Sequence, residues 1–234
     1  MQRYVVRMAL APIEVFVFHA VAESYDATRF LRQDWTPTDE FETELRRLKK
    51  RYTFISLPQA CQKLKHDLIR REHYAVLTCD DGFASVLDVL PVILGEQIPI
   101  TLFINPKYLD GVSIREGYAR HPLYITHNQL FDIHSPLVTV GMHGYEHTDS
   151  TLLTPSEFQK DVECCIDLLQ NHPNYIPYYA YTWGRFNDST QHILDKMGVT
   201  PLFCDGTSNW RYHGGISRRC IDSPGQMSFE FVNS

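Results

Sequence analysis

The sequence lacks the features that define several large classes of protein. None of its six cysteines forms a Cys-x-x-Cys pair, which argues against a disulfide or cysteine–zinc framework and favours reduced core thiols. No stretch approaches the ~20 apolar residues that a membrane-spanning helix requires. Acidic residues (28) outnumber lysine and arginine (22), and no long basic run is present. We therefore expect neither a membrane span nor a nucleic-acid partner.

The N-terminal segment also lacks the shape of a secretory signal. Its apolar stretch over residues 8–22 is interrupted by Pro12, Glu14 and His19. This predicts a cytoplasmic protein. The chain has 234 residues, 44% of them hydrophobic, which suffices for one large core. We expect a single domain covering residues 1–234 and leave its oligomeric state open.

Apolar strand-like runs alternate with helical patterns along the chain. This alternation predicts an α/β fold with a parallel sheet and outer helices, whose active groups lie at the C-terminal ends of the strands. A long irregular segment over 105–127 has the character of a functional loop. Strands are predicted at 13–18, 53–56, 74–79, 100–104, 137–142, 178–181, 200–204 and 216–221, and helices at 38–50, 58–64, 84–95, 128–132, 156–169 and 188–197.

Two adjacent carboxylates, Asp80 and Asp81, follow the predicted strand 74–79 and precede Gly82. Because side chains alternate in direction along a strand, one carboxylate can bind a cation while the other handles a proton. Buried carboxylates cost several kcal/mol unless they are paired or bound to metal. The alternative is a structural role, in which an Asp caps the predicted helix 84–95.

A pair of histidines, His143 and His147, follows the predicted strand 137–142. If this loop turns helically, residues four apart lie on one face and can share a cation. Two histidines and one carboxylate leave open positions for water and substrate, as in a catalytic zinc site. Glu146 is either a support for a ligand or a solvated charge. The two motifs together predict a metal site far more strongly than either does alone.

With these motifs the chain resembles the polysaccharide deacetylases that share the NodB homology domain, the group of carbohydrate esterase family 4. Their first motif, T-F-D-D-G, corresponds to T-C-D-D-G at Thr78–Gly82. Their second motif, H-S/T-x-x-H, corresponds to H-G-Y-E-H at His143–His147. Their third, in the form F-A-Y-P-Y-G, corresponds to Y-A-Y-T-W-G at Tyr179–Gly184. The resemblance covers most of the chain and implies an irregular (β/α)7 barrel.

The resemblance also implies a role for each matching residue. Asp81, His143 and His147 would hold a divalent metal, for which we expect Zn2+ with Co2+ or Ni2+ as alternatives. Asp80 would be the general base, and the backbone N–H of Trp183 would stabilise the developing oxyanion. The implied substrate is an N-acetylated carbohydrate, and the metal would activate a water for attack on its acetyl group.

Several positions depart from the family pattern. Ala180 stands where many members carry an Arg that orients the base, and Arg185 is a weak substitute for which we expect a surface or substrate role. Gly144 stands where Ser or Thr is usual, and Thr182 replaces a Pro. The family's general acid is a histidine of a later motif. His213 is the candidate for this role, although its setting equally suits a loop residue.

Two further sets of residues have open roles. His19, at the end of the first predicted strand, either lines the pocket or is a hydrogen-bonded strand-end residue. Tyr145 and Trp183 are candidates to stack on a sugar, because aromatic rings offer a flat apolar surface with a polar tip.

The predicted activity is metal-dependent removal of N-acetyl groups from an amino sugar, in a polymer or in a lipid- or nucleotide-linked precursor. Two alternatives remain open: an amidohydrolase that acts on a small non-sugar amide, and a carbohydrate-binding pseudoenzyme. The missing Arg and the unplaced acid favour the pseudoenzyme. Asp80 opposes it, because metal binding alone would not require a second carboxylate.

Overall fold

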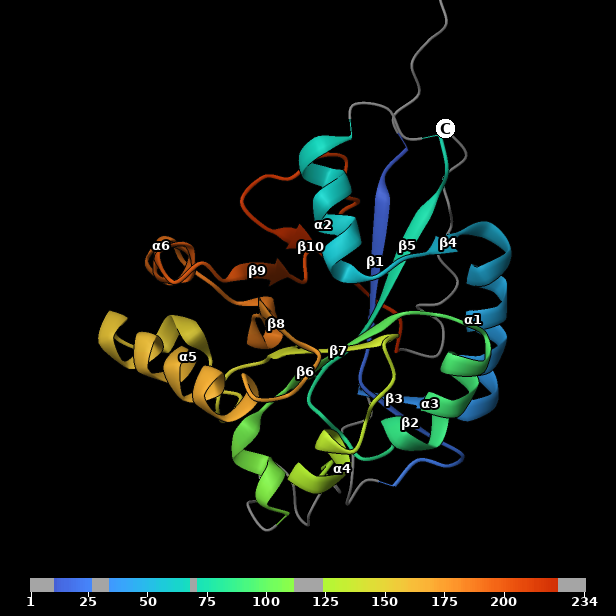
Figure 1. The fold of residues 1–234 in the computed structure, drawn as a ribbon, viewed down its shortest axis with the longest axis horizontal. Coiled ribbons are helices and arrows are strands. Elements are labelled where there is room, and N and C mark those ends of the chain that lie inside the picture. Colours follow the sequence, from blue (N-terminus) through green and yellow to red (C-terminus); the bar gives the residue numbers. More distant parts are fainter. Residues whose placement is uncertain (1–10, 27–33, 68–70, 112–123, 223–234) are drawn as a thin grey trace, which may run out of the picture.

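A sheet of parallel strands forms the centre of the computed structural model, which describes residues 11–26, 34–67, 71–111 and 124–222 (Figure 1). Its strands are β1 (Ile13–Phe18), β4 (Thr53–Phe54), β5 (Tyr74–Cys79), β6 (Ile100–Ile104), β7 (Val138–Met142), β8 (Tyr175–Ala180), β9 (Thr200–Phe203), β10 (Ile216–Ser217) and β11 (Arg219–Cys220). Hydrogen-bonded neighbours follow the order β10-β9-β8-β7-β6-β5-β1-β11, and β4 pairs with β5. All of these pairings are parallel, as the β–α alternation predicts.

Helices surround this sheet, and most of them begin with a clear sequence signal (Figure 1). The N-terminal residues of α2, α4, α5 and α6 form capping boxes, in which a polar side chain and the third helical residue satisfy each other's backbone N–H groups. The helices are α1 (Thr38–Arg51), α2 (Leu57–His66), α3 (Val86–Gly95), α4 (His127–Phe131), α5 (Pro155–Leu169) and α6 (Asp188–Lys196). Short 3-10 turns are η2 (Pro106–Asp110), η3 (Ser150–Leu152) and η4 (Thr182–Gly184), and β2 (Ala20–Ala22) pairs with β3 (Trp35–Pro37).

The two edges of the sheet meet at a single residue, Arg218. This residue alone separates β10, which pairs with β9, from β11, which pairs with β1. The Arg218 N–H donates to the Phe203 carbonyl at 2.9 Å, and the Ile221 N–H donates to the Val17 carbonyl at 2.9 Å. The chain therefore crosses from the last strand to the first, and the sheet is a nearly closed barrel of the predicted (β/α)7 class.

The core lies on both faces of the central strands. All six residues of β1 are buried, as are all five of β6. Parallel strands covered on both faces bury both sets of alternating side chains, which explains why these strands are apolar except for Glu14 and Thr101. In the described part of the chain, no helix combines the length and the apolar character needed to cross a membrane.

The structure corrects three expectations about the elements. The predicted helix 84–95 begins at Val86 with Ser85 as its N-cap residue, so neither Asp80 nor Asp81 caps it. The predicted strand 216–221 is two short strands that pair at opposite edges of the sheet. The pair β2–β3 was not predicted, because strands of three residues leave no periodic pattern. Residues 112–123 of the predicted loop 105–127 lie outside the described part.

Candidate active site

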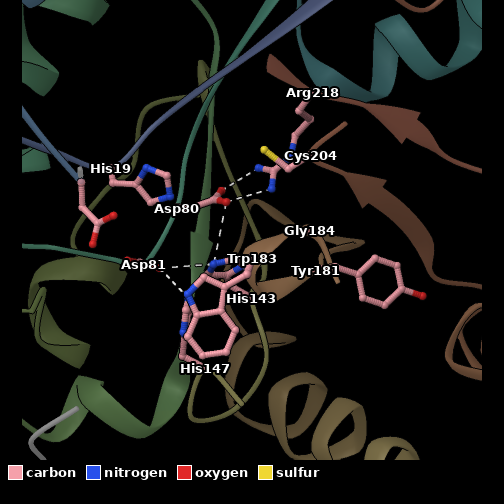
Figure 2. A pocket seen from close by; sticks show the side chains of 11 residues that line it. His19, Asp80, Asp81, His143, His147, Tyr181, Trp183, Gly184, Cys204 and Arg218 are labelled. Carbon is pink, nitrogen blue, oxygen red and sulfur yellow. Dashed lines mark hydrogen bonds and ion pairs between the residues drawn. The ribbon is translucent and has the colours of Figure 1, made fainter. Parts of the chain in front are cut away.

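A pocket of about 210 Å³ lies at the C-terminal ends of the barrel strands (Figure 2). Both sequence motifs reach it, because the loops that follow β5 and β7 end at the same rim. The pocket is lined by His19, Asp34, Asp80, Asp81, His143, His147, Tyr181, Trp183, Gly184, Cys204 and Arg218.

Three buried side chains on one wall of this pocket converge as metal ligands would. The Asp81 Oδ1 atom lies 3.2 Å from Nε2 of His143 and 3.2 Å from Nε2 of His147. The three ligand atoms all lie within 4.8 Å of one another. Ligand atoms around a tetrahedral zinc ion are about 3.3 Å apart, given metal–ligand distances of about 2.0–2.2 Å. The donor set and its spacing therefore fit a divalent cation.

The backbone bends sharply at this wall. In the described part of the chain, four non-glycine residues have positive φ, and three of them line the pocket: Asp81 (70°), His147 (62°) and Trp183 (51°). Each such conformation costs on the order of 1–3 kcal/mol and persists only where the surroundings enforce it. Their concentration here marks the wall as a built site rather than an incidental cluster.

A backbone carbonyl orients His143. Its Nδ1 atom lies 2.8 Å from the Ala180 carbonyl oxygen, which can only accept a hydrogen bond. Nδ1 therefore carries the proton, and Nε2 presents its lone pair toward Asp81. The Asn105 side-chain amide also holds this loop in place, because its Nδ2 donates to the carbonyl of His143 and, at 2.9 Å, to the carbonyl of Gly144.

Gly144, the departure from the family's Ser or Thr, is explained by a carboxylate from helix α5. Asp161 accepts the Tyr145 N–H at 3.0 Å and the Tyr179 hydroxyl at 3.3 Å. A Cβ at Gly144, whose φ is +75°, would lie 3.1 Å from that hydroxyl. The Asp161–Tyr179 pair thus occupies the space of the usual side chain and anchors the loop itself. Burial raises the pKa of Asp161 to about 6.

Arg218 provides the guanidinium that the sequence did not place. It binds Asp80 through two hydrogen bonds, from NH1 to Oδ1 at 2.7 Å and from NH2 to Oδ2 at 2.8 Å (Figure 2). Burial would raise the pKa of Asp80, but Arg218 and then His143 outweigh it and hold this pKa below its usual value. Arg185 instead pairs with Asp149 at 2.8 Å with its side chain 63% exposed.

The wall of the pocket opposite Asp81, His143 and His147 contains the Asp80–Arg218 pair and also a histidine–aspartate pair. The His19 Nδ1 atom is hydrogen-bonded to Oδ2 of Asp222, and the His19 backbone N–H donates to Oδ1 at 2.8 Å. Burial would lower the pKa of His19, but the Asp222 carboxylate outweighs it and raises this pKa well above its usual value. Both roles considered for His19 therefore apply, since it is a hydrogen-bonded strand-end residue and also lines the pocket.

The remaining predicted residues are only partly brought together. Trp183 is 58% exposed, and its indole lies edge-on to the His147 ring, with centroids 4.6 Å apart. Tyr145 packs against the hydrophobic core and is not among the described residues that line the pocket. His213 lies in a separate hollow beside Trp210. Neither the stacking role of Tyr145 nor the acid role of His213 is supported by these positions.

Comparisons with known proteins agree with this geometry. The sequence model of the polysaccharide deacetylase family matches residues 68–202, more than half of the chain, so the protein belongs to this family. It is 24% identical over 197 residues to YxkH of Bacillus subtilis (strain 168), whose name assigns it to the polysaccharide deacetylases. The match covers 81% of this chain and 64% of YxkH, so the chain spans less than two thirds of that relative.

Solved structures show the same fold. IcaB from Ammonifex degensii superposes with a TM-score of 0.78 at 21% identity, covering 93% of this chain and 94% of IcaB. The Streptococcus pyogenes deacetylase PplD, in complex with acetate, superposes with a TM-score of 0.74 at 18% identity, covering 91% and 93%. Identities this low establish the fold alone. The family and the barrel expected from the sequence motifs are thus confirmed.

Proposed function

We propose that this protein is a metal-dependent hydrolase that removes N-acetyl groups from an acetylated amino sugar. Family membership supports an acetylated carbohydrate as the substrate class. The observation that carries the proposal is that Nε2 of His143 and Nε2 of His147 each lie 3.2 Å from Oδ1 of Asp81. A separate carboxylate, Asp80, lies beside them and is bound by Arg218. A divalent cation held there, Zn2+ by preference, would lower the pKa of a bound water and polarise the acetyl carbonyl.

Asp80 is the proposed general base. Its low pKa keeps it a carboxylate at neutral pH, and Arg218 fixes the plane of both oxygens. It accepts the proton that the attacking water loses. The absent motif-three Arg favoured a pseudoenzyme at the sequence level. That objection loses its force once Arg218 occupies the position from another element.

His19, rather than His213, is the proposed general acid. Asp222 holds the Nδ1 atom, so Nε2 is the atom that delivers a proton to the departing nitrogen. The environments push the two pKa values apart, so that Asp80 is ionised while His19 is protonated. An acid and a base separated in this way are what hydrolysis at neutral pH requires.

Trp183 is proposed to act through two groups. Its backbone N–H would donate to the oxygen on which negative charge develops, as expected from the third motif. Its exposed indole, at the mouth of the pocket, offers a flat face to a sugar ring. The left-handed conformation of Trp183 gives its backbone N–H and its indole orientations that differ from those in a regular turn.

Acetate release from N-acetylated oligosaccharides tests the proposal. The wild-type protein loaded with Zn2+ or Co2+ should release acetate, and Asp80→Asn should lose roughly 100-fold or more in rate while retaining its metal. No acetate under any metal, with sugar binding retained, would establish the pseudoenzyme instead. Acetate released faster from small non-sugar amides than from any oligosaccharide would establish the amidohydrolase.

A further inference from the structure

A second group of metal-ligating side chains lies on the wall opposite the Asp81 triad. His19 Nδ1, Cys220 Sγ and a carboxylate oxygen of Asp222 all lie within 4.8 Å of one another. The Cys220 thiol is 3.2 Å from Asp222 Oδ2, the same oxygen to which His19 Nδ1 is hydrogen-bonded. Three different donor atoms therefore surround one point beside the pocket.

The protein holds this group in place from several elements. Asp222 is fully buried, and its backbone carbonyl accepts the Thr36 hydroxyl at 2.9 Å. His19 follows β1, and Cys220 belongs to β11, which pairs directly with β1. His19 and Cys220 are only partly buried, and His19 lines the pocket. His19 therefore connects this group to the pocket.

We propose that His19, Cys220 and Asp222 form a second, inhibitory zinc site. One imidazole, one thiolate and one carboxylate are zinc ligands, and three protein ligands leave a fourth position for water. Tetrahedral zinc places such atoms about 3.3–3.6 Å apart, close to the sulfur–oxygen separation already present. The His19–Asp222 contact, which holds a proton, would widen as the cation takes the proton's place.

Inhibition follows from the protons that leave, and this part rests on the proposed function. Binding displaces the Nδ1 proton of the imidazolium and the thiol proton to solvent, two protons for one Zn2+. His19 then keeps a proton on Nε2 as a neutral, metal-bound imidazole, a far weaker acid than the imidazolium. Zinc at this site would therefore remove the general acid while the Asp81 triad stays loaded.

Cobalt binding separates the two sites because only the second contains sulfur. Chelator-treated protein would be titrated with Co2+ and followed by absorbance and by metal content. We expect two equivalents to bind, the weaker one with a thiolate-to-cobalt charge-transfer band in the near ultraviolet. The band should vanish in Cys220→Ser and Cys220→Ala but persist in Cys204→Ser, a thiol that lines the pocket. Binding of the first cobalt equivalent, at the Asp81 triad, would show that the Cys220 variants are folded.

Excess zinc provides the second readout. Excess Zn2+ should strongly inhibit acetate release by the wild type and by Cys204→Ser. The zinc concentration for half-inhibition should rise by more than about tenfold in Cys220→Ser, since even the loss of an outer partner costs this much affinity. A single cobalt equivalent, or a band that survives in Cys220→Ala, would overturn the second site. Absent acetate release would overturn the proposed function while leaving the cobalt titration decisive.

Discussion

The two walls of the pocket are assembled in different ways. On the metal wall, Asp81, His143 and His147 come from two five-residue motifs, one of which begins at the end of β5 while the other directly follows β7. On the proton wall, Arg218 lies between β10 and β11 and Asp222 follows β11, and they bind Asp80 and His19, respectively. The metal wall depends on local turns, whereas the proton wall depends on closure of the barrel.

This difference predicts that the walls can be damaged separately. The loop that carries His143 and His147 has its own anchors in Asn105 and Asp161, whose side-chain hydrogen bonds go to this loop and to Tyr179. The orientation of Asp80 instead requires that Arg218 arrive at the junction of β10 and β11. Variants of one wall should therefore leave the other wall's readout intact.

The largest effect is expected on the metal wall. His143→Ala removes one of the three ligands of the Asp81 triad, so zinc bound at this triad should fall to near zero and acetate release should fall by about 1,000-fold or more. Metal content and acetate release would be measured on the same samples. His213→Ala, which changes a histidine outside the pocket, is the matched control and should retain both. Full zinc content in His143→Ala would contradict the ligand assignment.

Arg218→Gln tests the proton wall at its junction. It leaves the buried Asp80 without its bidentate partner, which should destabilise the protein by about 3–5 kcal/mol at neutral pH. The wild-type pKa of Asp80 is depressed, so this stabilisation is present at neutral pH and is lost as pH falls through the folded-state pKa. The variant's deficit should therefore shrink in acid.

The same variant should alter catalysis in a way that simple destabilisation would not. Without the guanidinium, the pKa of Asp80 rises, so the acidic limb of the kcat/KM profile should move to higher pH. Arg219→Gln is the matched control, because Arg219 is the next residue in the sequence and its side chain lies 3.8 Å from Glu14. An unmoved acidic limb in Arg218→Gln would show that Asp80 is oriented by something else.

The contrast between the walls also explains what could be predicted from the sequence. Asp81, His143 and His147 were predictable because each follows an apolar strand, and parallel strands deliver their C-terminal ends to one rim. Most element boundaries followed from the same alternation and from capping residues. Local sequence was enough wherever a short motif contains the residues of the candidate site.

Arg218 was not predictable in this way, because its role depends on pairing between strands far apart in the sequence. A tail containing Arg218 and Arg219 does not show which of them faces inward. One signal was present: Arg218 lies two residues after the buried Ile216, and residues two apart in an extended strand point to the same face. The proposed acid, His19, differs from the residue predicted from the sequence, His213, for a related reason. His213 lies nearer in sequence to the family's late motif, whereas His19 reaches Asp222 only through the β1–β11 pairing.

A smaller effect is expected from Asp222→Asn, which tests the proposed acid. The Asp222 carboxylate raises the pKa of His19, so its removal should move the alkaline limb of kcat/KM to lower pH. Roughly tenfold lower activity is expected at mildly alkaline pH, with little change in acid. The first metal equivalent should still bind. An unchanged alkaline limb would remove His19 from the reaction.

The last effect is on stability alone and concerns the anchor of the metal wall, Asp161. Its pKa is raised from its usual 3.8 to about 6 by burial, so the unfolded chain ionises it at lower pH than the folded protein does. Folding is therefore penalised progressively as pH rises between these values, by at most about 3 kcal/mol above them. Asp161→Asn removes this titration while its amide oxygen still accepts the Tyr145 N–H.

The free energy of unfolding by urea, measured for both proteins in chelator at several pH values, isolates this term. The difference should change in favour of Asp161→Asn as pH rises from about 4 to about 6, and then stay constant. Asp167→Asn, an exposed change on the same helix, should show no such trend. A difference independent of pH would mean that Asp161 is ionised throughout. The carboxylate that anchors the loop would then be charged, like the Asp80 carboxylate on the opposite wall.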